Sequence, residues 1–121
     1  MSSTNFEDLQ IWKRSSRLAS DILKSAQDWK LWPLRDQAYR SAISVPSNIA
    51  EGCERDSCPE IIRFLRIAKG SLAELQTQLY LASELDIIST RQLNEWIKES
   101  KEIAAMTQSL ITHYRGKSNK E

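Results

Sequence analysis

Residues 57–82, SCPEIIRFLRIAKGSLAELQTQLYLA, carry the pattern that decides the fold. Apolar residues recur at alternating spacings of four and three, at Ile61, Leu65, Ala68, Leu72, Leu75, Leu79 and Ala82. This spacing places them on one face of an α-helix, as in helices packed in a bundle. Ser57 and Glu60 form a capping box, and Pro59 is tolerated in the first helical turn. The stretch therefore predicts a helix over about 58–85.

Two more helices are predicted before this stretch, over about 5–28 and 34–52. Thr4 and Glu7 form a capping box for the first, and Gly52 is expected to cap the C-terminus of the second. The seam of the first helix is Leu9, Trp12, Ser16, Ala19, Leu23 and Ala26, with a second row at Ile11, Ser15, Leu18, Ile22 and Trp29. Such a wide apolar face suits a subunit interface and deep burial in the chain's own core equally well.

A proline interrupts the second predicted helix. Pro46 removes the hydrogen bond to the carbonyl of Ala42 and crowds the preceding turn, so we expect a kink there. Ser44, Ser47 and Asn48 flank the proline and can bond the backbone groups left open. The stretch is interpreted as a structural bend, with a small-molecule site that uses Asn48 and the open backbone groups as the alternative.

The last predicted helix spans about 90–114, with Ser89 as its cap and Gln92 in the box position. Its seam is Leu93, Trp96, Ser100, Ile103, Thr107, Leu110 and Tyr114. Four helices joined by short links predict one all-α domain over residues 1–115, an antiparallel up-down-up-down bundle. Residues 116–121 contain no apolar residue and are expected to form a flexible tail. No period-two alternation persists, so no sheet is expected.

The composition limits the possible functions. The 121 residues are 40% hydrophobic, and 17 basic and 16 acidic residues give a net charge of +1. A dedicated nucleic-acid binder usually carries a strong basic excess, so any basic surface here must arise from segregation of charges. The sequence shows neither a signal peptide nor a run of about 18 apolar residues, which predicts a cytoplasmic protein without a membrane partner.

The sequence offers little for catalysis or metal binding. Cys53 and Cys58 with one histidine, His113, cannot complete a four-ligand zinc site. A disulfide is conceivable, but reduced thiols are the default for a cytosolic protein. The Glu-x-x-His pairs of a di-iron bundle and a nucleophile elbow are both missing from the sequence. The chain is therefore expected to have no cofactor, no metal and no enzyme activity.

Three blocks of the sequence resemble a known family. They are FEDLQIWK (6–13), QAYRSAISVPSNIAEG (37–52) and RDSCPEIIRFLRIAKGSLAELQTQL (55–79), and their order and spacing resemble the 23S rRNA intervening-sequence protein family. The resemblance implies a four-helix bundle that assembles as a ring-shaped homopentamer. It also implies a link to nucleic acid, because a related protein, the accessory variability determinant of diversity-generating retroelements, works with a reverse transcriptase and binds nucleic acid through a basic ring surface.

Two sets of candidate residues follow. The motif residues expected to fix helix register or subunit contacts are Pro46, Asn48, Glu51, Gly52, Glu60, Gly70 and Glu74. The basic residues that could contact phosphates are Lys13, Arg14, Arg17, Arg40, Arg55, Arg63, Arg66 and Lys69. Alternatively, these cations are solvated and paired with glutamates three or four residues away, as Arg63 with Glu60, and Arg40 or Arg55 is the expected partner of Glu51.

The sequence thus predicts a non-enzymatic homo-oligomeric scaffold, a pentameric ring by resemblance, that associates with RNA, DNA or a nucleic-acid enzyme. The alternative is a protein-interaction scaffold without nucleic-acid affinity, which the near-neutral charge favours.

Overall fold

The computed structural model describes the backbone of residues 5–120 and the side chains up to residue 118. The elements are a short 3-10 helix η1 (Phe6–Asp8) and the α-helices α1 (Gln10–Ala26), α2 (Trp32–Cys53), α3 (Cys58–Glu84) and α4 (Thr90–Lys120). The described residues form no strand. The chain is therefore an all-α four-helix bundle, as its sequence predicts.

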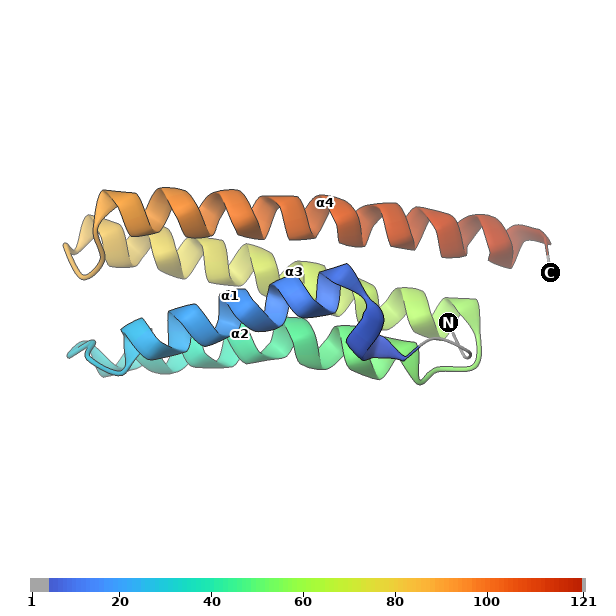
Figure 1. The fold of residues 1–121 in the computed structure, drawn as a ribbon, viewed down its shortest axis with the longest axis horizontal. Helices are drawn as coiled ribbons and strands as arrows, with labels where there is room; N and C mark the ends of the chain where they lie inside the picture. Colours follow the sequence, from blue (N-terminus) through green and yellow to red (C-terminus); the bar gives the residue numbers. More distant parts are fainter. Residues whose placement is uncertain (1–4, 121) are drawn as a thin grey trace.

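The four helices lie along one long axis (Figure 1). The α1–α2 and α3–α4 links lie at one end of the bundle, and the α2–α3 link lies at the other (Figure 1). Each helix packs against the next one in the chain, and α4 also contacts α1. Within the described residues the helices are too polar or too short to serve as membrane spans.

The predicted seams of α2, α3 and α4 form the core. Leu65, Leu72 and Leu79 of α3 are fully buried, and Ile103 of α4 is buried beside them. In α1 the assignment of the seam was wrong. The second row is buried throughout, whereas Leu9, Trp12, Ser16 and Leu23 of the predicted seam are only partly buried. Because the two adjacent rows are similarly apolar, the sequence does not determine which of them α1 turns toward the core. Packing against α2 determines this rotation of the helix about its axis.

The start of the first helix also differs from the prediction. The expected helix from residue 5 is divided, because Leu9 is extended at φ −78° and ψ 130° between η1 and α1. The Phe6 ring packs edge-on against Trp12, with 5.2 Å between ring centroids, and this contact folds the first residues back onto α1. The expected cap Thr4 lies outside the described residues.

Helix α2 is continuous through Pro46 and ends one residue beyond Gly52. The expected role of Gly52 as a C-terminal cap is wrong, because no described glycine has a positive φ. Gly52 instead lies where α2 closely approaches α3: a Cβ added there would be 3.3 Å from the Cβ of Phe64. The kink at Pro46 stays a prediction.

Local capping signals located the starts of α3 and α4 well. The Ser57 hydroxyl accepts a hydrogen bond from the Glu60 backbone N–H, as predicted. At α4, the Ser89 hydroxyl accepts from the Gln92 backbone, and the Gln92 side chain accepts from the Ser89 N–H at 2.9 Å. Helix α4 continues to Lys120, six residues past the predicted end at 114. The helix continues although Gly116, Ser118 and Asn119 are weak helix formers.

Candidate nucleic-acid interface

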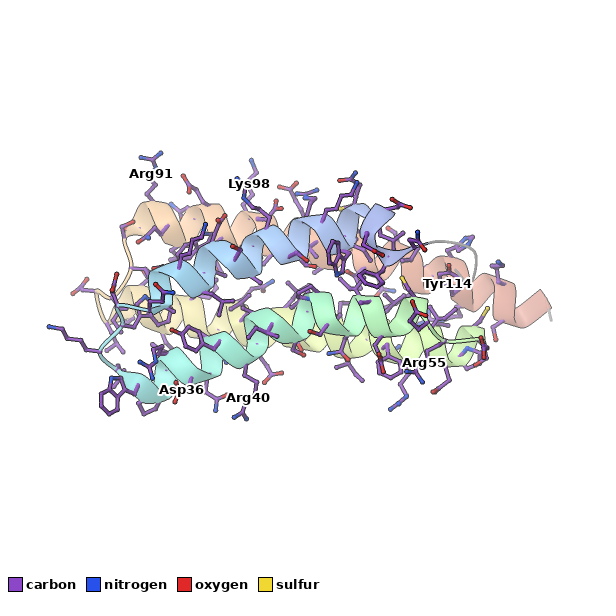
Figure 2. The ribbon with its side chains drawn as sticks, turned by 60° about the horizontal axis from the view of Figure 1, so that its bottom comes forward. Asp36, Arg40, Arg55, Arg91, Lys98 and Tyr114 are labelled. Atoms are coloured by element: carbon purple, nitrogen blue, oxygen red, sulfur yellow. The ribbon has the colours of Figure 1, made fainter. Side chains whose placement is uncertain are left out.

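The eight basic residues predicted from the sequence do not form one surface. Arg14 of α1 bonds to Glu99 of α4, whereas Arg40 projects from α2 on another side of the bundle (Figure 2). Five of the eight bond to other side chains of the chain: Arg14, Arg17, Arg55, Arg63 and Lys69. Lys13, Arg40 and Arg66 form no ion pair within the described part of the chain. Their charges remain available to a partner.

Arg14 ties α1 to α4. Its guanidinium donates from Nε to Glu99 at 2.9 Å and from Nη2 to Glu102 at 3.0 Å. The hydrogen bond from Arg14 lowers the pKa of Glu99, and the two glutamates in turn raise the pKa of Arg14. With two carboxylates around it, Arg14 joins α1 to α4, and its charge is compensated within the chain.

A second paired cluster lies where α2 meets α3. The guanidinium carbons of Arg55 and Arg63 lie 4.9 and 4.8 Å from the centre of the Phe64 ring. Arg55 pairs with Glu51 at 2.6 Å, and Arg63 pairs with Glu60 at 3.2 Å. Both predicted pairings are confirmed, with Arg55 as the partner of Glu51. We call these five residues the α2–α3 arginine cluster; its two positive and two negative charges cancel.

The flank of α3 that faces α4 is different. Lys69 donates from Nζ to Oε1 of Gln108 at 2.7 Å, which fixes the register between the two helices. The short link 85–89 makes them run in opposite directions, so residues before Lys69 lie beside residues after Gln108. On this flank, Arg66 is three residues before Lys69, and Arg115 is seven residues after Gln108.

The flank continues toward the α3–α4 link. There, Gln76 of α3 lies seven residues after Lys69, and Lys101 of α4 lies seven residues before Gln108. We call Arg66, Lys69, Lys101 and Arg115 the α3–α4 basic line. Arg66, Lys101 and Arg115 are exposed and form no ion pair within the described residues. The line therefore carries positive charge that no described carboxylate compensates.

Sequence reasoning missed the α4 half of this line. Lys101, Gln108 and Arg115 recur every seven residues, a signal that places them on one face of a helix. The heptad spacing could have shown that they share a face. It could not have shown that this face adjoins Arg66 and Lys69, because the register depends on a contact across 39 residues of sequence.

The remaining motif residues connect α2 to α3. Asn48 donates from Nδ2 to the Ser44 carbonyl at 2.8 Å and to the Ser44 hydroxyl at 2.9 Å, and that hydroxyl lies 2.8 Å from the Ser71 hydroxyl. These bonds favour a packing role for the Pro46 stretch, since they occupy the polar groups that a ligand would need. The carbonyl of Ala42 is the group that Pro46 leaves without a backbone hydrogen bond. In the described structure neither Ser44 nor Asn48 donates a side-chain hydrogen bond to it.

Two other motif residues, Gly70 and Glu74, meet no partner inside the chain, so their expected role in subunit contacts stays a prediction. A Cβ added at Gly70 would have no atom within 4 Å. Glu74 is exposed and forms no ion pair among the described residues. Both lie on the outer face of α3, where nothing in the chain packs against them. Gln78, nearby on α3, is 9% exposed, and its Oε1 has no hydrogen-bond partner in the described structure.

The cysteines are buried near the end of the bundle and are not joined by a disulfide. Burial raises the pKa of Cys53 to about 11, so its thiol stays protonated at neutral pH. Burial also raises the pKa of Tyr114 on α4. Among the described residues, His, Cys, Asp and Glu form no group able to hold a metal ion.

The fold and the sequence comparisons agree on the class. The chain is a four-helix bundle built from amphipathic helices, and the sequence profile of the 23S rRNA-intervening sequence protein family matches residues 7–109. The chain belongs to that family. The profile extends beyond the resemblance read from the sequence and includes most of α4.

A solved structure shares the fold. It is a protein of unknown function from the S23 ribosomal protein family of Bacteroides thetaiotaomicron VPI-5482, with a TM-score of 0.80 and 25% sequence identity. The match covers 84% of this chain and 97% of that one. Among proteins with curated descriptions, none matches this chain.

Proposed function

We propose that this chain is a non-enzymatic, cytoplasmic scaffold that assembles into a ring-shaped homopentamer and binds nucleic acid along the α3–α4 basic line. The observation that carries the proposal is the uncompensated charge of Arg66, Lys101 and Arg115 on one flank. Exposed lysines and arginines contact phosphates without reading sequence, so the expected partner is the backbone of an RNA or DNA.

Exposed apolar side chains support the assembly. Ile43 of α2 is 49% exposed, and Ile67 and Leu81 of α3 are 40% and 50% exposed. Gly70 lies between the last two and leaves open space at the surface. An apolar, small-residue face of this kind on a bundle is suited to packing against another copy. In a ring each copy would repeat the basic line, so a net charge of +1 per chain is compatible with a local positive surface.

Two measurements test the proposal separately. Light scattering coupled to size-exclusion chromatography gives the mass of the assembly, and the proposal predicts five times the 13.9 kDa chain. An Ile67→Glu, Leu81→Glu variant should shift that mass toward the monomer, because it buries charge in the contact. A monomeric wild type would contradict the assembly.

Fluorescence anisotropy with labelled structured RNA and duplex DNA tests the binding. We expect saturable binding at low salt that weakens as salt rises. Absence of binding at low salt would favour the second candidate function, a protein-interaction scaffold. The compensated charges of the α2–α3 arginine cluster support this alternative. In that case affinity purification should return one protein partner.

A further inference from the structure

The α3–α4 basic line ends next to an exposed tyrosine. Tyr80 lies eleven residues, or about three helical turns, after Lys69, which places it on the same side of α3. It also lies one turn after Gln76, and the contact between Lys69 and Gln108 sets Gln76 beside Lys101 of α4. The side chain of Tyr80 is 49% exposed. The flank therefore combines exposed cations with an aromatic ring to which the proposed function gives no role.

The rise of the α-helix gives the dimensions of this flank. Lys101 and Arg115 are each seven residues from Gln108, so they lie about 10 Å on either side of the contact between Lys69 and Gln108. Tyr80 lies about 16 Å from Lys69 along α3, which is about 6 Å past Lys101. The cations of the basic line thus form a row of about 20 Å with the tyrosine at one end.

A carboxylate lies beyond the tyrosine. Glu84 is exposed and lies one turn after Tyr80 on the same side of α3. A polyanion that continued past Tyr80 would approach this carboxylate and be repelled by it, whereas Lys101 attracts a phosphate on the other side of the ring. The charge pattern therefore favours a strand that ends, or leaves the surface, at Tyr80.

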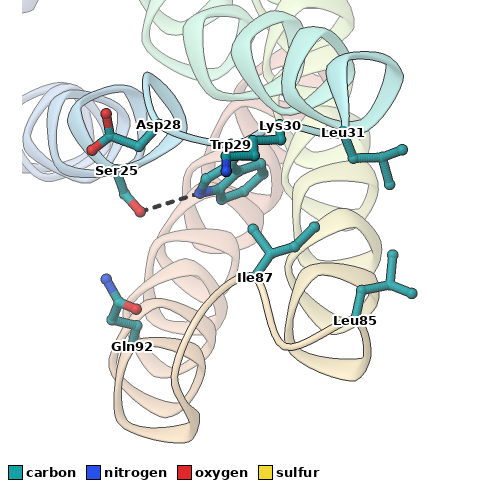
Figure 3. Close-up of a pocket in the computed structure, with 8 residues that line it drawn as sticks. All are labelled: Ser25, Asp28, Trp29, Lys30, Leu31, Leu85, Ile87 and Gln92. Atoms are coloured by element: carbon teal, nitrogen blue, oxygen red, sulfur yellow. Dashed lines mark hydrogen bonds between the residues drawn. The ribbon is translucent and has the colours of Figure 1, made fainter.

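The other aromatic residues lack this setting. Trp32 is 65% exposed, but it lies on α2, which has no contact with α4 in the described part of the chain. Trp29 forms part of the wall of a cavity of about 730 Å³ at the end of the bundle (Figure 3). Its ring is 4% exposed, and its indole N–H donates to the Ser25 hydroxyl at 3.3 Å, so little of the ring can stack on a ligand. Tyr80 is thus the exposed aromatic residue that adjoins the basic line.

The straight row of cations suits a single strand better than a duplex. One turn of a duplex takes about 34 Å, so a row of about 20 Å meets the backbone of each strand about once. A flexible single strand can follow the whole row. Tyr80 gives the same preference, because the face of a base is free to stack on an aromatic ring only where the base is not stacked within a duplex.

We propose that the α3–α4 flank binds single-stranded nucleic acid, with phosphates along the basic line and one base stacked on Tyr80. A positively charged surface combined with exposed aromatic rings is how proteins bind single strands without sequence preference. Every base has a face that can stack, so affinity should depend little on sequence. The inference rests on the proposed nucleic-acid binding and names the form of nucleic acid that is bound.

Fluorescence anisotropy of the full chain compares a labelled oligothymidylate of about ten nucleotides with a DNA duplex of about twenty base pairs. We expect the single strand to bind about tenfold more tightly at low salt, because it adds a stacked base to the phosphate contacts. Four phosphate contacts at about 0.7 each give a slope of log affinity against log salt of about 2.8 for the single strand. Two contacts at about 0.9 each give about 1.8 for the duplex.

Tyr80→Leu separates stacking from charge. It should weaken binding of the oligothymidylate about tenfold and leave the salt slope unchanged, because it removes no phosphate contact. Tyr80→Phe keeps the ring and should bind like the wild type. Trp32→Leu is the matched control, since it removes an exposed aromatic residue away from the basic line, and it should leave binding unchanged. Far-UV circular dichroism shows whether each variant keeps its helices.

An abasic strand makes the same test without a change in the protein. A chain of abasic deoxyribose phosphates of the same length keeps the charges of the oligothymidylate but has no base to stack. It should bind the wild type about tenfold more weakly than the oligothymidylate does. Its affinity should not respond to Tyr80→Leu.

Three results would overturn the inference: equal or tighter binding of the duplex, unchanged affinity for the oligothymidylate in Tyr80→Leu, or an equal loss in Trp32→Leu. If the duplex still binds and its binding weakens with salt, each of these results leaves the proposed function standing. Absence of binding by both the single strand and the duplex would contradict the proposed function as well.

Discussion

Helix α3 carries basic side chains on both flanks, and the two flanks differ in what surrounds the charge. Toward α2, Arg55 and Arg63 stack on Phe64 and pair with glutamates. Toward α4, Lys69 bonds to the Gln108 amide, and Arg66 and Arg115 form no ion pair with a described carboxylate. A count of arginines and lysines treats the flanks alike, whereas only the second one leaves charge for a phosphate.

The largest expected effect comes from removing the second flank. Arg66→Gln, Lys101→Gln and Arg115→Gln together should reduce the affinity for nucleic acid by about 10- to 100-fold at low salt, since each charged contact contributes of the order of 0.5–1 kcal/mol. Fluorescence anisotropy measures the change. The control Lys13→Gln, Lys24→Gln, Arg40→Gln removes the same charge from other exposed positions. An equal loss in the control would show that net charge, not the basic line, binds the partner.

Replacing Arg14 should affect the stability of the fold, not the affinity for nucleic acid, because this cation has a structural role. Arg14→Met keeps the aliphatic stem but leaves Glu99 and Glu102 without their partner, and we expect unfolding free energy to fall by about 1 kcal/mol at neutral pH. Chemical denaturation measures it. Arg17→Met is the control, since Arg17 is 83% exposed and 3.8 Å from Asp21; a similar loss there would contradict a special role for Arg14.

The pH dependence of the same variant follows from the lowered pKa of Glu99. In the folded state the pKa of Glu99 lies below the ordinary glutamate value of about 4.3. The pairing of the ionised Glu99 with Arg14 therefore stabilises the fold above that pH. This contribution disappears as the pH falls through the folded-state pKa. The stability difference between the wild type and Arg14→Met should therefore shrink as the pH is lowered from 7 to 3. A constant difference would show that packing, not the ion pair, is responsible.

Two glycines give the smallest effect and compare the packed and the open sides of α3. Gly70→Ala should stabilise the isolated chain by about 0.5–1 kcal/mol through helix propensity, because open space surrounds it. Gly52→Ala should gain less or destabilise, because its Cβ would press on Phe64. Thermal denaturation gives both values. Equal stabilisation would contradict the close approach of α2 and α3, and loss of assembly in Gly70→Ala would show that another copy covers that face.

Signals confined to one or two helical turns predicted much of the fold. The alternating spacing of Leu65, Leu72 and Leu79 identified the core face of α3, and the Ser89–Gln92 box located the start of α4. Both depend on contacts three or four residues apart, which the sequence states directly. The sequence pattern gave the wrong role for Gly52. Glycine suits a helix C-cap because it tolerates a positive φ, and it suits a close approach of two helices because it has no side chain, so its presence does not distinguish the two.

The candidate site was harder to predict because it depends on contacts between helices. The sequence predicts Arg14 as a candidate phosphate ligand, and only the fold shows that its charge is paired with Glu99, 85 residues later. The pairing of Arg63 with Glu60 was predictable, since the two are three residues apart. The association of Lys69 with Gln108 depends on the rotation and register of two helices, which the residue pattern of each helix leaves undetermined.

The most direct test of the contrast between the two flanks is the salt dependence of RNA binding in two variants, Arg66→Gln with Arg115→Gln and Arg55→Gln with Arg63→Gln. The slope of log affinity against log salt counts the phosphates engaged, at about 0.7–0.9 per contact. We predict that the first variant flattens the slope by about two contacts and that the second leaves it unchanged. Flattening by the second variant alone would contradict the assignment of the α3–α4 basic line.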